Sequence, residues 1–526
     1  MTDPKDYSSK VWVATATLIL LLVGVSFIPP FEVWGVGLRR ANILSELITF
    51  EPKQELPLQE EVEIEEIDVD WAEVSAQVAE HQQPEEVAVE RNLSWEVEPE
   101  ELPEGALSEE SLVELSPRPA PAVPIENFDT TLHDPLKTLY GKLARRERVR
   151  IAFLGDSFVE GDILTADLRE ALQEHLGGAG AGFAPIASPL TGFRRTIKTQ
   201  AKGWSSYNVM QQAKSPEQVQ PNFTITGWVC TPEKGAVTRW EMTDARRHLT
   251  PCRGANLWFR SEERSTLRVT LNDTLQHHFE IEGEGALRQI SLSHPELRSL
   301  EVEVVDGASG FMGYGAQFHG NEGVTLDNYS VRSNNGRALF WTSPALNAQL
   351  HQVSPYDLVI LQYGLNIMQQ GVYGYSRYAA QLEQMVAYVR ECFPGAAILL
   401  LGVSERWVKG EQGFAPMDAI PSMLEWQRRA AEKSGVAFWN TCEAMRAQGG
   451  MEHFVAQGWA GKDYTHINFG GGRRIAQELF EALYAGAYEA WQEEQRKVVR
   501  RVETPQIERG EEVDSLLFGQ LLQPIE

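Results

Sequence analysis

The sequence RVRIAFLGDSFVEGDILTADLREAL, residues 148–172, joins a short apolar run to an amphipathic segment. Residues 149–154 form a short run that is apolar apart from Arg150, which predicts a buried strand, and helical spacing begins at Asp162. In an open α/β sheet, ligands bind outside the carboxyl ends of the strands, so Ser157 is expected to face a crevice. Ser157 is either an ordinary helix N-cap or a nucleophile, and the tripeptide Gly155-Asp156-Ser157 alone favours the cap.

Strands and helices alternate over most of the C-terminal half, which predicts a parallel sheet flanked by helices. Residues 201–322 differ, because short alternating runs separated by Gly, Asn and Asp turns indicate an inserted β-sandwich of the jelly-roll kind. The chain is therefore expected to be an α/β protein with an inserted β domain. Buried strands are expected at 356–364, 396–403 and 436–441, and helices at 135–147, 162–175, 375–392, 422–435 and 471–493.

Residues 11–28 are apolar or small and carry no charge, and Pro29-Pro30 follows them. Eighteen such residues are near the minimum for a transmembrane helix, so an uncleaved signal anchor is expected within residues 1–40. A cleaved signal peptide is the alternative. In both cases the body of the protein is expected to be exported, and with an anchor it is expected on the periplasmic side of the inner membrane.

The acidic residues are concentrated between the predicted anchor and the first predicted helix. Residues 51–114 hold 22 acidic and two basic residues, which is most of the net charge of −27. This composition predicts a largely disordered tether over residues 41–128 and leaves the folded part only mildly acidic. The sequence shows no basic stripe, so nothing in it suggests a nucleic-acid partner. The remaining domains are expected at 129–200, 201–322 and 323–495, with a C-terminal tail at 496–526.

The four cysteines include no CxxC pair, so a structural zinc site is not expected. Cys230 and Cys252 lie in one β-rich region and are candidates for a disulfide in an oxidising compartment. Five aromatic residues in or near the insert are candidates for stacking on sugar rings: Trp204, Tyr207, Trp228, Trp240 and Trp258. For any single one of them, a place in the core of the β-sandwich is the simpler interpretation.

Three further pieces of sequence carry chemistry that a serine nucleophile needs. Asp463 and His466 lie three residues apart before the last helix, a spacing that lets a carboxylate orient an imidazole base. Asn366 follows a predicted strand and is suited to donate its amide to an oxyanion. Gly336, in SVRSNNGRAL, is a candidate for a second donor through its backbone N–H. Each piece alone is also compatible with an ordinary turn.

Taken in order, Gly155-Asp156-Ser157, Gly336, Gly364-Leu365-Asn366 and Asp463-Tyr464-Thr465-His466 resemble the four motif blocks of the SGNH (GDSL-type) hydrolases. The resemblance implies that Ser157 is the nucleophile, His466 the base and Asp463 its orienter. It also implies an oxyanion hole made by Ser157, Gly336 and Asn366, and it implies no metal or organic cofactor.

Within that family, the insert and the sequence after Ser157 resemble bacterial peptidoglycan O-acetylesterases. The resemblance implies a serine esterase that removes acetyl groups from a cell-envelope polysaccharide. An O-acetyltransferase with the same residues, working beside a membrane acyltransferase, is the first alternative. A non-catalytic glycan-binding or scaffold protein is the second.

Overall fold

The computed structural model describes residues 17, 31–33, 36–38, 61–81, 92–97, 114–189, 192–411 and 413–503. The chain divides into two compact units, Met1–Gln59 and Glu60–Glu526. In the first unit the described strands are β1 (Phe31–Val33) and β2 (Val36–Leu38), which pair antiparallel. The predicted anchor at 11–28 lies, apart from Thr17, outside the described residues, and none of the helices that are described is long and apolar enough to span a bilayer.

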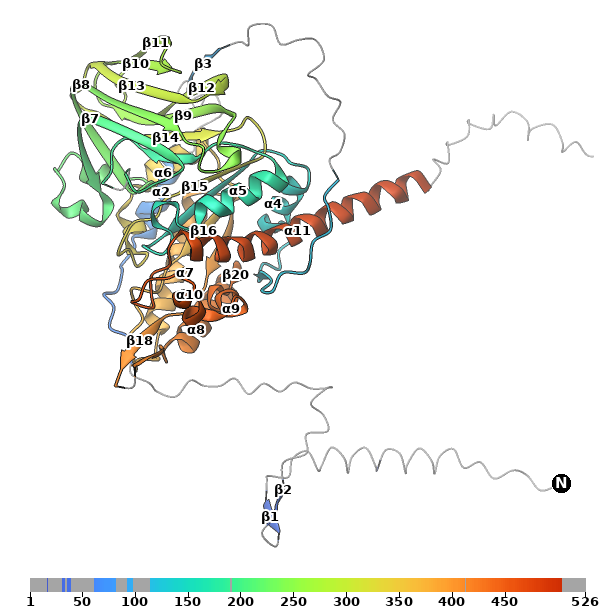
Figure 1. Ribbon diagram of the computed structural model, residues 1–526. Coiled ribbons are helices and arrows are strands. Elements are labelled where there is room, and N and C mark those ends of the chain that lie inside the picture. The colour runs from blue at the N-terminus through green and yellow to red at the C-terminus, as the bar shows by residue number, and fades with distance from the viewer. Residues whose placement is uncertain are drawn as a thin grey trace, which may run out of the picture. The chain divides into compact units, whose positions relative to one another are not determined.

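A six-stranded sheet organises the second unit (Figure 1). Five strands run parallel, and the short β4 joins the edge antiparallel to β20. In spatial order the strands are β15 (Val324–Asn328), β5 (Val149–Gly155), β16 (Leu358–Gln362), β17 (Ala397–Leu401), β20 (Ala437–Trp439) and β4 (Glu126–Asn127). β5, which comes first in sequence among the parallel strands, thus lies between β15, the second, and β16, the third.

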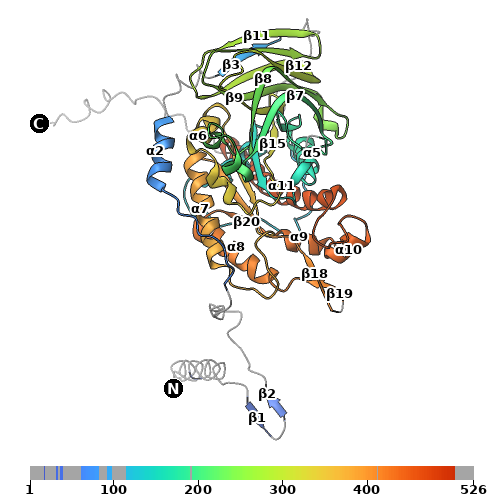
Figure 2. The ribbon, with the colours of Figure 1, turned by 90° about the vertical axis from the view of Figure 1, so that its left-hand side faces the viewer.

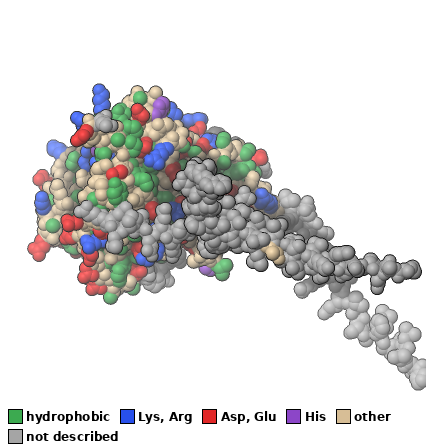
Figure 3. Space-filling model, turned by 90° about the horizontal axis from the view of Figure 1, so that it is seen from below, with side chains coloured by type: hydrophobic (Ala, Val, Ile, Leu, Met, Phe, Trp, Pro, Cys, Tyr) green, Lys and Arg blue, Asp and Glu red, His purple; other side chains and the backbone are tan. Residues whose placement is uncertain are grey.

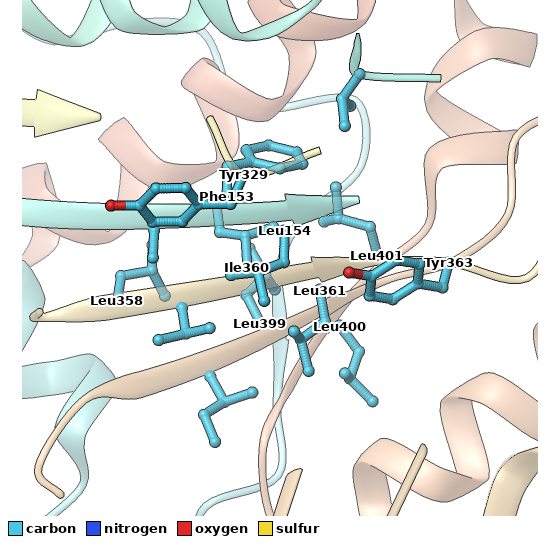
Figure 4. Close-up of a cluster of buried hydrophobic side chains, with 14 of the residues drawn as sticks. Phe153, Leu154, Tyr329, Leu358, Ile360, Leu361, Tyr363, Leu399, Leu400 and Leu401 are labelled. Atoms are coloured by element: carbon cyan, nitrogen blue, oxygen red, sulfur yellow. The ribbon is translucent and has the colours of Figure 1, made fainter. Parts of the chain in front are cut away.

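Helices cover both faces of this sheet, which is why β5, β16 and β17 are buried at every position. Figure 4 shows side chains from neighbouring strands, such as Phe153, Ile360 and Leu399, meeting in one apolar layer. On one face α4, α5 and α11 pack together, and on the other α6, α7 and α8 do (Figure 2). The helices of this layer are α4 (Pro135–Ala144), α5 (Thr165–Leu176), α6 (Pro344–Val353), α7 (Ser376–Cys392), α8 (Ile420–Ser434), α9 (Thr441–Ala447), α10 (Gly450–Ala456) and α11 (Phe469–Glu503).

The insert lies between α5 and β15 in sequence and forms most of a ten-stranded sheet. It begins earlier than residue 201, because β6 pairs with β14 and the predicted boundary falls inside β7. Its strands are β6 (Gly182–Pro185), β7 (Ile197–Asn208), β8 (Trp228–Met242), β9 (Cys252–Ser261), β10 (Ser265–Leu271), β11 (Leu275–Ile281), β12 (Leu287–Leu297), β13 (Ser299–Asp306) and β14 (Phe311–His319). Short 3-10 turns are η1 (Glu160–Asp162), η2 (Val209–Lys214), η3 (Gln220–Asn222), η4 (Arg247–Leu249) and η5 (Arg337–Trp341).

The insert has one apolar core between two parts of its sheet. The long strand β8 pairs with β14 near its start and with β13 near its end, so it belongs to both parts. Trp240 on β8 packs edge-on against Phe318 on β14, with ring centroids 6.1 Å apart. Trp240 and Trp258 are fully buried, which excludes them from stacking on a sugar, whereas Trp204, Tyr207 and Trp228 are half-buried.

The hypothesis of a Cys230–Cys252 disulfide is wrong in this structure, because both cysteines are free and buried. Cys230 pairs with Gly313 on β14, while Gly254, two residues after Cys252, pairs with His319 on the same strand. Six residues of an extended strand span about 20 Å, far more than a disulfide can bridge.

The expectation of a largely disordered tether is also corrected for part of its length. The N-terminal strap, residues 61–81, begins with a hydrogen bond from Val62 N–H to the Gly374 carbonyl oxygen, 2.8 Å long. It continues into α2 (Trp71–His81), which packs against α6 and α7. Further on, β3 (Asn92–Glu96) joins the insert's sheet beside β12. The acidic composition did not predict this packing, because a few buried apolar side chains such as Val74 and Val78 are enough to anchor one side of an acidic helix.

On the face of the molecule seen in Figure 3, acidic and basic side chains are interspersed.

Candidate active site

The candidate site lies at the carboxyl end of the parallel sheet. Strand order reverses at β5, with β15 on one side and β16 on the other, and such a switch point is where ligands bind in open α/β sheets. Ser157 follows the end of β5 by two residues, and Asn366 follows the end of β16 by four. The topology alone therefore brings two of the predicted site residues to one edge.

The predicted nucleophile and base are in contact. Ser157 Oγ lies 3.4 Å from His466 Nε2, although 309 residues separate them. This is a long hydrogen bond, as expected before a substrate draws the groups together. Ser157 is half-buried, so its hydroxyl is open to a substrate.

Asp463 orients the base. Its Oδ2 lies 2.7 Å from His466 Nδ1, and its Oδ1 accepts the N–H groups of Thr465 and His466, both at 3.1 Å. Partial burial alone raises the pKa of Asp463, but the hydrogen bonds from the His466 ring and from these backbone groups outweigh it, so the pKa is lowered overall. An ionised Asp463 favours the neutral tautomer of His466 with its hydrogen on Nδ1, and in that tautomer Nε2 accepts the Ser157 proton.

The two predicted oxyanion donors beyond Ser157 are brought together, but their N–H groups are engaged in this structure. The Asn366 amide donates to Asp156 Oδ2 and to the Asn334 carbonyl oxygen, each at 3.1 Å. The Gly336 N–H donates to Asn334 Oδ1 at 2.9 Å. Both groups would have to turn from these partners to bind an oxyanion, so their role in an oxyanion hole stays a prediction.

Two residues that the sequence analysis gave no role, Asp156 and Asn334, hold this cluster together. Asn334 contacts both Asn366 and Gly336, and Asp156 ties Asn366 to the loop of the nucleophile. Gly336 has φ of +96°, and a Cβ there would lie 2.6 Å from Met385 Sδ, so only glycine brings its N–H to this place. The motif SNNGR contained the signal for Asn334, but an Asn two residues before a Gly is also typical of an ordinary turn.

The predicted base and its carboxylate partner are strongly solvent-exposed. The side chains of His466 and Asp463 are 55% and 52% exposed. The site is therefore open enough for a large substrate and for water. Within the part of the chain that is described, no group of three or more His, Cys, Asp or Glu side chains is arranged to hold a metal ion.

Comparison with solved structures shows a shared fold. The structure entitled "Peptidoglycan O-acetylesterase in action" matches with a TM-score of 0.55 and 21% identity, covering 69% of this chain and 99% of that one. Two family two carbohydrate esterases match less closely. The one from Clostridium thermocellum has a TM-score of 0.24 and 10% identity, covering 49% of this chain and 93% of that one. The one from Cellvibrio japonicus has a TM-score of 0.24 and 10% identity, covering 56% of this chain and 99% of that one. No family model and no curated protein matches the chain.

Proposed function

We propose that this chain, which has the fold of the SGNH hydrolases, is a serine esterase that removes O-acetyl groups from a cell-envelope polysaccharide. The observation that carries the proposal is the continuous path of contacts from Asp463 through His466 to Ser157. A glycan-binding scaffold has no need of an oriented imidazole beside a solvent-accessible serine, so the non-catalytic alternative is disfavoured.

The arrangement supports a two-step acyl transfer. Ser157 Oγ attacks the acetyl carbonyl carbon while His466 Nε2 takes the hydroxyl proton. When the tetrahedral intermediate collapses, the bond to the sugar oxygen breaks and His466 returns the proton to it. Water then attacks the acetyl-serine, with His466 again as base, and acetate leaves. Each N–H that reaches the oxyanion lowers the barrier by about 3 kcal/mol.

Exposure of the site favours hydrolysis over transfer to a sugar. An acetyl-serine beside a half-exposed His466 is reached by water, whereas a transferase has to exclude water until the acceptor sugar arrives. A partnership with a membrane acyltransferase belongs to the transferase alternative and is disfavoured with it.

Two observations support an envelope polysaccharide as substrate. A solved structure that shares the fold is named as a peptidoglycan O-acetylesterase. The apolar segment at 11–28 supports an exported protein held at the inner membrane, where its body would meet the cell envelope.

The proposal is tested with the full chain and an aryl acetate, with and without an excess of chitooligosaccharide. Ser157→Ala should lower the rate at least about a thousandfold while circular dichroism stays unchanged. Ser293→Ala, on β12 of the insert, is the matched control and should keep the wild-type rate. Free acetate as the main product in both conditions supports an esterase. Acetylated sugar would favour the transferase, and turnover that survives in Ser157→Ala would contradict the mechanism.

A further inference from the structure

Exposed aromatic side chains flank the candidate catalytic loop on two sides. In the part of the chain that the structure describes, five large apolar side chains are at least a third exposed: Leu132, Phe193, Leu275, Trp341 and Phe414. Two of them contact aromatic residues close to His466 in sequence: the Phe193 ring packs at a tilt against Phe469, and the Phe414 ring stacks on Tyr464. Such side chains at the mouth of an open site indicate contact with a ligand more than with the protein's own core.

The first group, which we call the insert-side platform, consists of Phe193 and Phe469. Phe469 lies three residues after His466, and its ring centroid is 5.6 Å from that of Phe193, which is 47% exposed. The Arg195 guanidinium lies 4.0 Å from the Phe469 centroid and fixes this ring. A Cβ on Gly161 would lie 2.2 Å from Phe193 Cδ1, so the Phe193 ring rests directly on the loop that follows the nucleophile.

The second group, which we call the hairpin platform, consists of Trp407, Phe414 and Tyr464. The two-stranded hairpin of β18 (Trp407–Gly410) and β19 (Gly413–Pro416) carries Trp407 and Phe414. The Tyr464 ring stacks on Phe414 at 4.3 Å and on Trp407 at 5.7 Å, and Trp407 N–H donates to the Tyr464 carbonyl oxygen at 3.0 Å. Tyr464 lies between Asp463 and His466 in sequence and has φ of +53°, a costly conformation for an aromatic residue. The stack therefore holds a rigid aromatic surface beside the base.

The two platforms lie on different sides of the nucleophile. Gly161, under Phe193, belongs to the loop after β5 that faces β15, because Asn328 at the end of β15 donates to the Val159 carbonyl oxygen at 2.8 Å. The hairpin follows β17, on the far side of β16. Figure 2 shows β18 and β19 at one end of the α/β layer and the insert at the other.

We propose that the two platforms stack on sugar rings of one glycan chain that runs across Ser157, so that acetyl groups within a chain are the preferred target. The electron-rich faces of aromatic rings attract the polarised C–H groups on the face of a sugar, while the hydroxyl groups at its rim stay in water. Two such faces on either side of Ser157 bind a chain better than a single sugar. This inference rests on the proposed function and deepens it, because it names the form of the substrate.

The test compares O-acetylated chitohexaose with an aryl acetate, using the full chain. Phe193→Ala and Phe414→Ala should each lower the ratio of kcat/KM on the hexaose to that on the aryl acetate about five- to tenfold, mainly through KM. Phe414→Trp keeps an aromatic face and should restore most of the ratio. Leu275→Ala, at a side chain as exposed as Phe414 but on β11 of the insert, is the matched control and should leave the ratio unchanged.

Equal losses on both substrates would overturn the proposal, because they would make the aromatic groups supports of the catalytic loop and not binding surfaces. Calorimetric binding of chitohexaose to Ser157→Ala gives a readout that does not need turnover. Addition of Phe193→Ala or Phe414→Ala to that variant should weaken binding by the same factor. Unchanged affinity would refute the platforms even if the esterase activity is found. If Ser157 supports no turnover but the affinities change as expected, the proposed function fails and the platforms remain.

Discussion

Asp156, the residue before the nucleophile, is the least expected feature at the residue scale. It is fully buried, and its two oxygens accept hydrogen bonds from the Phe158 N–H at 2.9 Å and the Asn366 amide at 3.1 Å. Burial raises its pKa to about 7, because the hydrogen bonds of Phe158 and Gln362 offset only part of the cost of removing its charge from water. Asp156 thus holds Asn366 at a cost in stability.

That cost has a defined pH dependence. The pKa of Asp156 is higher in the folded than in the unfolded protein, so between about pH 4 and pH 7 the folded state binds more protons. The free energy of unfolding should therefore fall as the pH rises through this window, by up to roughly 4 kcal/mol from this group. Asp156→Asn should remove that fall while it lowers kcat, because Asn366 loses its acceptor.

Urea unfolding of the wild type and Asp156→Asn at pH 4.5 and pH 8 measures this effect. The variant should gain stability relative to the wild type at pH 8. A difference between the two proteins that is the same at both pH values would show that Asp156 stays ionised in the folded state.

Some site residues are predictable from the sequence and others are not. Ser157, Asp463 and His466 were assigned because the four motifs follow one another in the order of the SGNH hydrolases, since each motif alone is equally compatible with a cap or a turn. The functions of Asp156 and Asn334 depend on contacts with Asn366, which lies 210 and 32 residues away in sequence. No local pattern reports such contacts, so these residues emerge only from the fold.

At the scale of elements, the start of α11 packs closely on the loop that follows Ser157. Gly470-Gly471-Gly472 form its first turn, a sequence that weakens a helix. A Cβ on Gly472 would lie 1.9 Å from the Ile163 carbonyl oxygen, in the loop after Ser157. The glycines therefore weaken the helix, but they allow it to approach the loop after Ser157 closely.

Gly472→Ala separates these two effects. Helix propensity alone predicts a gain of about 1 kcal/mol, but a clash with backbone atoms has to move α11 or the loop. We expect a lower melting temperature and a lower kcat, because the distance from Ser157 Oγ to His466 Nε2 is already 3.4 Å.

Gly470→Ala is the matched control for this prediction. Its nearest contact would be Trp459 Cδ1, at 3.0 Å, so it should cost less than Gly472→Ala in both measurements. Equal kcat for the two variants and the wild type would show that the distance between Ser157 Oγ and His466 Nε2 does not limit the reaction.

The predicted elements of the α/β layer were found where hydrophobic periodicity was strong. The structure has helices at 376–392 and 420–434 where the sequence predicted 375–392 and 422–435. The docked strap was missed because its acidic residues dominate its composition, although Val62, Val74 and Val78 are buried. Whether such a segment folds depends on the surface of α6 and α7 against which it packs, and the sequence of the segment alone does not reveal that surface.

At the scale of the whole molecule, a buried ionic cluster joins the loop of the nucleophile to the insert. Asp162 is almost completely buried and accepts hydrogen bonds from Arg194 Nε at 2.8 Å and Thr196 Oγ1 at 2.6 Å, both on the segment that enters β7. Arg169 on α5 completes the cluster, with its Nη2 3.2 Å from Asp162 Oδ1. Arg194 Nη2 also donates to the Ala181 carbonyl oxygen, 2.5 Å away, just before β6. The cluster thus ties the segment that enters β7 to the loop that follows Ser157.

Burial alone raises the pKa of Asp162, but the charges of Arg169 and Arg194 and the hydrogen bonds outweigh it, so the pKa lies far below its usual range. A group whose pKa is lower in the folded state stabilises the protein above its unfolded pKa of about 4, and this contribution is lost as the pH falls below that value. Asp162→Asn should lower the free energy of unfolding at pH 7 by about 3 kcal/mol, because two buried guanidinium groups lose their partner.

The same substitution should flatten the loss of stability between pH 5 and pH 3 and lower kcat on the aryl acetate, since the loop of the nucleophile loses its anchor. Urea unfolding at three pH values and steady-state kinetics measure both effects. Asp306→Asn removes an exposed ion pair with Lys234 and should leave both close to the wild type, because water already screens that pair. If Asp162→Asn lowered stability but left kcat unchanged, the cluster would hold the insert in place without positioning the nucleophile. An unchanged slope below pH 5 would instead show that other carboxylates control the acid stability of this protein.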